Sequence, residues 1–576
     1  MLMDRVFGVC VLVAASFAMT AADAVQADFM LDHVPDDAML YFGWQGTDAM
    51  GEAFEQSHFG SVRRDTNVDQ VVVGLLPIAG MFLGEHAGQI FRLITQLERV
   101  LWQRPWVMFV GDPASVTERL GAGPDVAVPT LRIGIIVKPG QHDRQVRQAL
   151  QQWERAMTDD NTPATWIDDG ERLGLMVGYD EQQVRDIHIV WRSLSRDTHF
   201  SHARRQVMNS PALLAYINIK RVARRIGDGA PLPGLMVDPS HLDAFITELD
   251  LNGMQRAVYA GGFQQRLWQG QLFVDAPAPR QGLARLFDAE PINDRELRAI
   301  PRSASWLSAY RLDAQVILNA VDNALHRLHH EADPVNAEIR KALTAGLGEL
   351  WLFYSDPTFI SPAGPGVSLV HQLRDGRPIE AVMPQLVEQL NGHDPEQPAV
   401  EQTQRDGMTI YQYTTPSGNY TFAWAIASNR LYVGTSVQTV AAAHAHTLRP
   451  GNALPQSSQF QRVRERLGNP PAGARLAFAD LQSTAPSMFQ GYAHAMQLNL
   501  GGLDMGPNLP NLRRLMPYLI PAGKSGWADD RGWHARSIEP FPGANLLSPS
   551  ATINLGTGTL AATILFSVTP ATAAGP

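Results

Sequence analysis

The residues best suited to metal chemistry form one short cluster, HRLHHE, in the second half of the chain. His326 and His330 are four residues apart, so they would share one face of a helix, and Glu331 follows directly. Zinc or nickel accepts two imidazoles and a carboxylate oxygen as ligands. The sequence indicates no further ligand elsewhere. The alternative is a helix end facing solvent, where the helix dipole favours histidine. We favour this alternative and expect no metal or other cofactor.

Adjacent aspartates are the next candidates for chemistry. They occur at Asp159–Asp160, Asp168–Asp169 and Asp529–Asp530. Hydrolysis by two carboxylates requires the groups to lie on opposite sides of the scissile bond, several ångströms apart. Sequence neighbours within IDDGE and ADDRG are instead typical of turns, which aspartate and glycine favour. We therefore assign no catalytic residue. HAHTL at His444 and HFSH at His199 are weaker metal candidates than the HRLHHE cluster.

The motifs of common enzyme classes are missing from the sequence. It has no G-x-S-x-G, H-E-x-x-H, P-loop or EF-hand pattern. GTGTLA at Gly556 lies too near the C-terminus to have the acidic partner that a dinucleotide-binding loop needs about 20 residues later. The net charge of −10 argues against a nucleic-acid partner. We interpret the basic stretch KRVARRIG, which begins at Lys220, as a solvated helix rather than a phosphate site.

The N-terminal residues 1–27 have the features of a secretory signal peptide. Arg5 supplies a weak positive region, and the 14 residues from Val6 to Met19 are uncharged and mostly apolar. Small residues precede two candidate cleavage sites, after Ala24 and after Ala27. The apolar run is shorter than the roughly 20 residues that a membrane span needs. We expect an exported protein, periplasmic or in the cell envelope, whose mature chain has no cysteine.

Similar stretches recur along the chain at a nearly constant spacing. RLWQGQLFVDAP resembles RGWHARSIEPFP, and their tryptophans lie 533 − 268 = 265 residues apart. Further counterparts follow in the same order: Ala38 and Ala304 at 266 residues, Ala212 and Ala474 at 262, Phe200 and Phe460 at 260, and Gly178 and Gly434 at 256. Loop insertions and deletions would produce such drift. We predict an internal duplication, with halves at residues 28–290 and 291–542 that pack together.

The same sequence predicts an α+β fold. TLRIGIIV, QRAVYAGGF, YTFAWAIA and NRLYVGTS are short runs rich in β-branched and aromatic residues and bounded by turns, as strands are. RQVRQALQQWERAM, IEAVMPQLVEQL and AQVILNAVDNALHRLHH place apolar residues three and four apart, as amphipathic helices do. The gaps between strands are short enough for hairpins. We therefore expect largely antiparallel sheets with helices packed on one face.

Two of these stretches carry a family resemblance. PDDAMLYFGW and NRLYVGTSVQTVAAA resemble the strand-helix opening and the strand-turn-helix signature of an exported bacterial family of unknown function. In the second stretch the resemblance implies a strand that ends at Gly434 and a helix capped by Thr435 or Ser436. The first half has VGYDEQQV at the matching place, where Asp180 can cap the helix. The family implies an exported, non-catalytic protein and supplies no catalytic residues.

Two apolar segments leave alternatives open. Residues 71–102 predict a buried, kinked helix, and the alternative is a hairpin that touches lipid or a groove for a partner. Residues 543–576 are uncharged, and their apolar part, residues 555–568, is short for a membrane span and is followed by no Lys or Arg. This tail is a low-complexity segment, a weak membrane anchor or a closing strand or helix.

The sequence as a whole predicts a non-catalytic structural or binding component of the cell envelope. Its function would come from a surface or groove between the two halves rather than from a reactive side chain. The expected partner is an envelope protein or polymer, with weak membrane association through the C-terminal tail as a further candidate. The alternative is a divergent hydrolase that acts on envelope polymers. A convergent pocket with an acidic pair of strongly shifted pKa would favour the enzyme.

Overall fold

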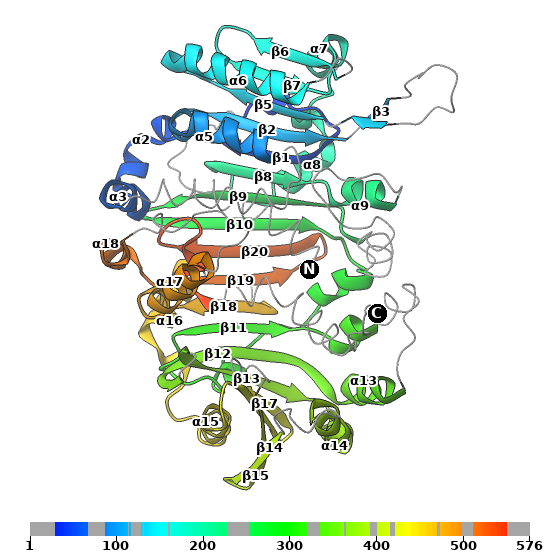
Figure 1. Cartoon of the computed structure of the whole chain (residues 1–576), viewed down its shortest axis with the longest axis vertical. Helices are drawn as coiled ribbons and strands as arrows, with labels where there is room; N and C mark the ends of the chain where they lie inside the picture. Colours follow the sequence, from blue (N-terminus) through cyan, green and yellow to red (C-terminus); the bar gives the residue numbers. More distant parts are fainter. Residues whose placement is uncertain are drawn as a thin grey trace, which may run out of the picture.

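The computed structural model describes residues 29–66, 87–112, 114–116, 128–130, 132–158, 162–189, 192–227, 253–319, 334–361, 364–391, 400–414, 421–468, 473–497 and 511–549. Within these ranges, 18 strands form one open antiparallel sheet (Figure 1). The predicted α+β class and antiparallel pairing are therefore confirmed.

The strands have the following bounds: β1 Ala38–Trp44, β2 Trp106–Gly111, β3 Ala114–Val116, β4 Val128–Thr130, β5 Ile133–Val137, β6 Ala164–Asp168, β7 Leu173–Val177, β8 Leu213–Ile217, β9 Arg256–Gln264, β10 Leu267–Asp275, β11 Trp306–Arg311, β12 Leu347–Ser361, β13 Gly364–Leu373, β14 Glu401–Arg405, β15 Met408–Thr414, β16 Thr421–Ala427, β17 Arg430–Gly434, β18 Arg475–Ala479, β19 Ala522–Ala528 and β20 Gly532–Glu539. Strands β3 and β4 pair only with each other among the described residues.

The strand order across the large sheet is the same on both sides of the central β10–β20 pair. Reading outward, β10-β9-β8-β1-β2-β5-β7-β6 on one side match β20-β19-β18-β11-β12-β13-β17-β16 on the other. The central pair is also symmetric in register, because Trp268 lies opposite Glu539 and Val274 lies opposite Trp533. Two further strands, β15 and β14, extend the sheet beyond β16.

The helices have the following bounds: α2 Thr47–Gln56, α3 His58–Asp65, α5 Ala87–Gln103, α6 Asp143–Met157, α7 Glu181–Ile189, α8 Thr198–Arg204, α9 Ile219–Gly227, α11 Asp294–Leu297, α13 Pro334–Gly346, α14 Arg377–Asn391, α15 Val437–Leu448, α16 Ser458–Arg466, α17 Leu481–Gln497 and α18 Leu512–Leu515. The predicted helices at RQVRQALQQWERAM and IEAVMPQLVEQL are α6 and α14, and both are confirmed.

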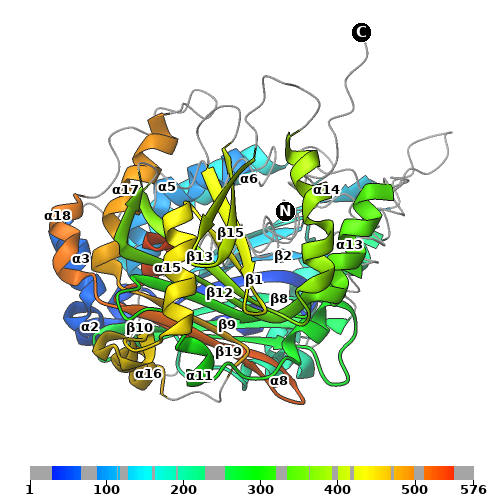
Figure 2. The ribbon, with the colours of Figure 1, turned by 90° about the horizontal axis from the view of Figure 1, so that it is seen from below.

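Helices lie on both faces of the sheet, which corrects the prediction that they cover one face. On β5, Ile135 belongs to the core under α5 and α6, whereas Ile136 packs with residues of α7 and α8 on the opposite face. Figure 2 shows α5, α6, α14 and α17 on one side of the sheet and α8, α11 and α16 on the other. The physical reason is that strands such as IGIIV are apolar on both faces, so both faces must be covered.

One apolar core cluster runs through both halves of the chain. It includes Phe42 and Trp44 of β1, Trp306 of β11 and, near the end of the described chain, Phe541 and Ala544. The helix η8, Ala544–Leu547, therefore packs against the core although it follows residue 542. Residues 555–568 lie outside the described ranges.

The predicted caps and turns are confirmed. Ser436 caps α15, because its Oγ accepts the backbone N–H of Thr439, and Asp180 Oδ1 accepts the N–H of Gln183 at 2.8 Å at the start of α7. Asp169 and Asp529 accept backbone N–H groups inside the β6–β7 and β19–β20 hairpins. These aspartates shape turns.

Candidate functional site

The histidines named from the sequence do not form a metal site in the described structure. His326, His330 and Glu331 lie outside the described residues. Among the residues that are described, no group of three His, Cys, Asp or Glu side chains is arranged to hold a metal ion. His444 is buried with its ring 5.4 Å from that of Tyr432, a packing role.

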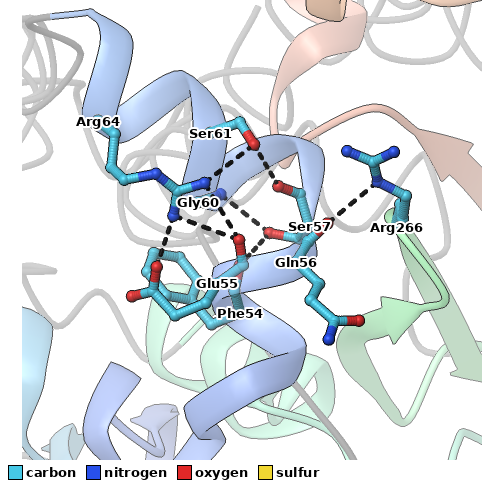
Figure 3. A network of polar contacts seen from close by, with 8 residues as sticks. All are labelled: Phe54, Glu55, Gln56, Ser57, Gly60, Ser61, Arg64 and Arg266. Atoms are coloured by element: carbon cyan, nitrogen blue, oxygen red, sulfur yellow. Dashed lines mark hydrogen bonds and ion pairs between the residues drawn. The ribbon is translucent and has the colours of Figure 1, made fainter.

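The candidate site begins at the corner between α2 and α3, which a single serine shapes. Ser57 Oγ accepts the backbone N–H of Gly60 at 2.9 Å and donates to the carbonyl oxygen of Phe54 at 2.6 Å (Figure 3). A Cβ at Gly60 would lie 2.3 Å from that same carbonyl oxygen, so only glycine fits there. The tight corner orients α3 so that Arg64 reaches back to Glu55 and Ser61.

The corner is anchored to the β9–β10 turn of the central sheet. The N–H of His58 donates to the carbonyl of Arg266 at 3.0 Å, and Arg266 Nε donates to the carbonyl of Gln56 at 3.1 Å (Figure 3). Beneath them Phe59 is fully buried, with its ring 6.0 Å from Trp102. The backbone of α3 is therefore held by packing and by the turn, and its charged side chains are left at the surface.

A cavity of about 360 Å³ lies where α3 of the first half meets α18 of the second. It is lined by Arg64, Asp65, Thr66, Asn511 and Arg514. Figures 1 and 2 both place α3 and α18 side by side at one border of the sheet. The two walls are joined directly, because the hydroxyl of Tyr518 donates to Asp65 and Arg514 Nη1 donates to the Asp65 carbonyl at 3.4 Å.

The surroundings of this cavity are positively charged although the protein is acidic overall. Burial lowers the pKa of His58, and the nearby guanidinium groups of Arg266 and Arg466 lower that pKa further. The hydrogen bond to Asp65 raises the pKa of Tyr518, while Arg64 and Arg266 oppose that rise. Four segments that are distant in sequence thus bring arginines to one place: α3, the β9–β10 turn, the end of α16 and α18.

The arrangement is suited to holding an anion. Guanidinium groups present several fixed N–H donors and bind carboxylates and phosphates through charge-assisted hydrogen bonds. Arg64 is half-exposed, and its partner Glu55 is more exposed still, so their ion pair is weak and replaceable. Sequence reasoning missed these residues. The only local signals were the adjacent arginines in SVRRD and NLRRL.

A second charged cluster lies at the end of β1 in the first half. Asp37 Oδ2 is 3.1 Å from Arg132 Nη1, and Asp37 Oδ1 accepts from the Tyr179 hydroxyl at 3.5 Å. The guanidinium of Arg132 stacks 4.9 Å above the ring of Tyr179. Burial raises the pKa of Asp37, and the charge of Arg132 only partly offsets that rise. A partly buried carboxyl of raised pKa is typical of catalytic acids, but structural networks show it as well.

Next to this cluster, Asp112 pairs with two arginines of the basic stretch KRVARRIG. Arg225 contacts Asp112 directly, and Arg221 Nη1 is 3.5 Å from its Oδ2. The prediction that this stretch is a solvated helix is therefore only partly right: it forms α9, but these two side chains are partly buried against an acidic partner. No phosphate role follows from the pairing.

The matching end of β11 in the second half has no such charge network. Ser303 takes the place of Asp37, as the β1–β8 and β11–β18 registers align, and its hydroxyl donates to Asp356 at 2.9 Å. Thr435 takes the place of Tyr179 after an equivalent glycine. The fold therefore tolerates uncharged residues at these positions.

Comparison with known proteins finds no matching family model, no matching curated protein and no matching solved structure. The family resemblance noted in the sequence therefore stays a prediction. Within the described ranges, none of the helices combines the length and the apolar character that a membrane crossing requires.

Proposed function

We propose that this protein is an exported, internally duplicated α+β component of the cell envelope that binds its partner through the cavity between α3 and α18. The observation that supports this best is the composition of the cavity, because its arginines come from both halves and meet only where the halves pack. Export is proposed from the signal-peptide features of residues 1–27.

Repeated side-chain contacts support the proposed duplication. Phe200 on α8 packs edge-on against Tyr216 of β8, with ring centroids 5.1 Å apart. Phe460 on α16 packs in the same way against Phe478 of β18 at 5.5 Å. The matched residues are 260 and 262 positions apart, since 460 − 200 = 260 and 478 − 216 = 262. Common ancestry of the halves explains why order, register and aromatic pairs agree.

A divergent envelope-polymer hydrolase is the second candidate function, and Asp37 is the observation that favours it. A carboxyl whose pKa is raised by burial can hold a proton near neutral pH and act as a general acid. However, the cavity between α3 and α18 is not lined by Asp37 or by its neighbour Asp36. We therefore place this candidate second.

Export and binding are tested together. The full chain is expressed in a Gram-negative host, the envelope and cytoplasm are separated, and the mature N-terminus is identified by mass spectrometry. We expect a chain that begins after Ala24 or Ala27 in the envelope fraction; an uncut cytoplasmic chain would contradict export.

The purified mature protein is then used to capture partners from envelope extracts, alongside Arg514→Gln and a control, Arg205→Gln, at an exposed site on the opposite face. We expect capture to be lost only in Arg514→Gln. Release of soluble fragments from envelope polysaccharide by the wild type, abolished in Asp37→Asn, would instead support the hydrolase.

A further inference from the structure

We propose that the cavity between α3 and α18 binds a phosphate group. This inference rests on the proposed function, because it names the chemistry that the same site recognises. The phosphate would be either free inorganic phosphate or the head group of an anionic phospholipid, since both present the same oxyanion.

The geometry of the charges carries the proposal. Arg64 and Arg514 line the cavity from two different helices, so their guanidinium groups approach it from separate walls. Oxygens that point in several directions, as those of a tetrahedral phosphate do, can each receive donors from both walls. A planar carboxylate is satisfied by one bidentate arginine and does not need two walls. Thr66 and Asn511 add neutral polar groups to the lining.

The charge balance of the lining favours a singly charged phosphate. Arg64 and Arg514 contribute two positive charges, and Asp65 contributes one negative charge, which leaves one positive charge to be neutralised. The carboxylate of Asp65 is already engaged by the hydroxyl of Tyr518. The potential from Arg266 and Arg466, which acts on His58 beside the cavity, reinforces the attraction for an anion.

The cavity also has room for more than an ion. Its volume of about 360 Å³ is roughly ten times the volume of one water molecule in the liquid. A phosphate ester with an attached glycerol therefore fits by volume. The site is at the surface, so a head group can enter while the rest of a lipid stays in the membrane.

Two binding experiments on the mature protein test the proposal, both in buffer without phosphate. Inorganic phosphate is titrated calorimetrically, and vesicles of phosphatidylglycerol are co-sedimented with the protein, with phosphatidylcholine vesicles as the control. Arg64→Gln and Arg514→Gln should each weaken binding about 10- to 100-fold, as expected for the loss of one charge-assisted hydrogen bond. Arg205→Gln should bind like the wild type, and added salt should weaken binding because the site is exposed.

Each outcome decides between sources or overturns the idea. Saturable binding of inorganic phosphate that depends on Arg514 identifies the free ion, and binding to phosphatidylglycerol vesicles alone identifies the lipid head group. Absence of both, or equal binding by the wild type and both variants with unchanged melting temperatures, overturns the proposal. Capture of an envelope component that depends on Arg514, without any phosphate or vesicle binding, would overturn this inference while the proposed function stands.

Discussion

At the scale of single residues, His371 shows how packing alone sets a titration. It is fully buried on β13, where its ring lies 3.8 Å from that of Trp351. The backbone N–H of Gly348 donates to His371 Nε2 at 3.2 Å, which requires that nitrogen to be unprotonated. Burial lowers the pKa of His371 to about 3.

This lowered pKa predicts a loss of stability in acid. The unfolded chain takes up a proton near pH 6.5, whereas the folded chain does not until about pH 3. The stabilisation is therefore complete above pH 6.5 and falls by about 1.4 kcal/mol for each pH unit below it. Urea unfolding at pH 7.5, 5.5 and 4.5 measures this slope. His371→Gln should flatten it, and exposed His202→Gln should not; equal slopes in all three proteins would refute the assignment.

The charged cluster at Asp37 makes a second point at this scale. Removing charges from water is costly, and a buried ion pair contributes little net stability. Because Ser303 and Asp356 occupy the matching place in the second half with a simple hydrogen bond, the charges of the first half are not required by the fold. They are the natural place to look for a role specific to that half.

At the scale of elements, helices α8 and α16 are fixed to the sheet in the same way. Phe200 and Phe460 are each about 1% exposed, and each meets one strand aromatic edge-on. If the two helices are equivalent, the two phenylalanines should contribute equally. We predict that Phe200→Ala and Phe460→Ala each lower the free energy of unfolding by about 3 to 5 kcal/mol.

The measurement is urea unfolding followed by tryptophan fluorescence, with Leu448→Ala as the control. Leu448 is 57% exposed on α15, so its truncation should change stability by less than about 0.5 kcal/mol. A large loss for one phenylalanine and almost none for the other would show that the two helices are not equivalent.

The edges of the sheet differ in a way that also belongs to this scale. On the outer edge of the second half, β14 reads EQTQR and is exposed throughout. Charged and polar residues of this kind discourage an edge strand from pairing with other chains. On the other edge, β6 is shorter of polar residues, with Trp166 held by Glu154 through a 3.1 Å hydrogen bond.

At the scale of the whole molecule, the continuous sheet ties the two halves into one structure. Strands β10 and β20 pair along eight residues, from Trp268–Glu539 to Asp275–Gly532. The largest core cluster contains residues from both sides of this seam. Neither half can open at the seam without exposing a long strand edge and part of a shared core.

We therefore predict a single cooperative thermal transition for the mature protein. Differential scanning calorimetry should give one peak, with a van't Hoff enthalpy close to the calorimetric enthalpy. Trp268→Ala, which removes a fully buried ring at the seam, should move the whole peak to lower temperature without splitting it. Two peaks in the wild-type protein would show that the halves unfold independently.

Local features were predictable from the sequence because their causes are local. The apolar spacing of α6 and α14, the cap at Ser436 and the turns at Asp169 and Asp529 each depend on residues within a few positions of one another. The recurring landmarks also gave the correct strand counterparts. The coverage of both faces was missed, although the unbroken apolar run of β5 indicated it.

The sequence by itself determined the class of the fold, the identity of many helices and strands, and the absence of a common catalytic motif, because these depend on composition and short-range pattern. Only the tertiary structure decided where the halves meet and which charges meet there. Asp65 and Tyr518 touch across 453 positions of chain, and the cavity beside them exists only after the central strands have paired. No local pattern encodes such a contact, since it depends on how every intervening element packs.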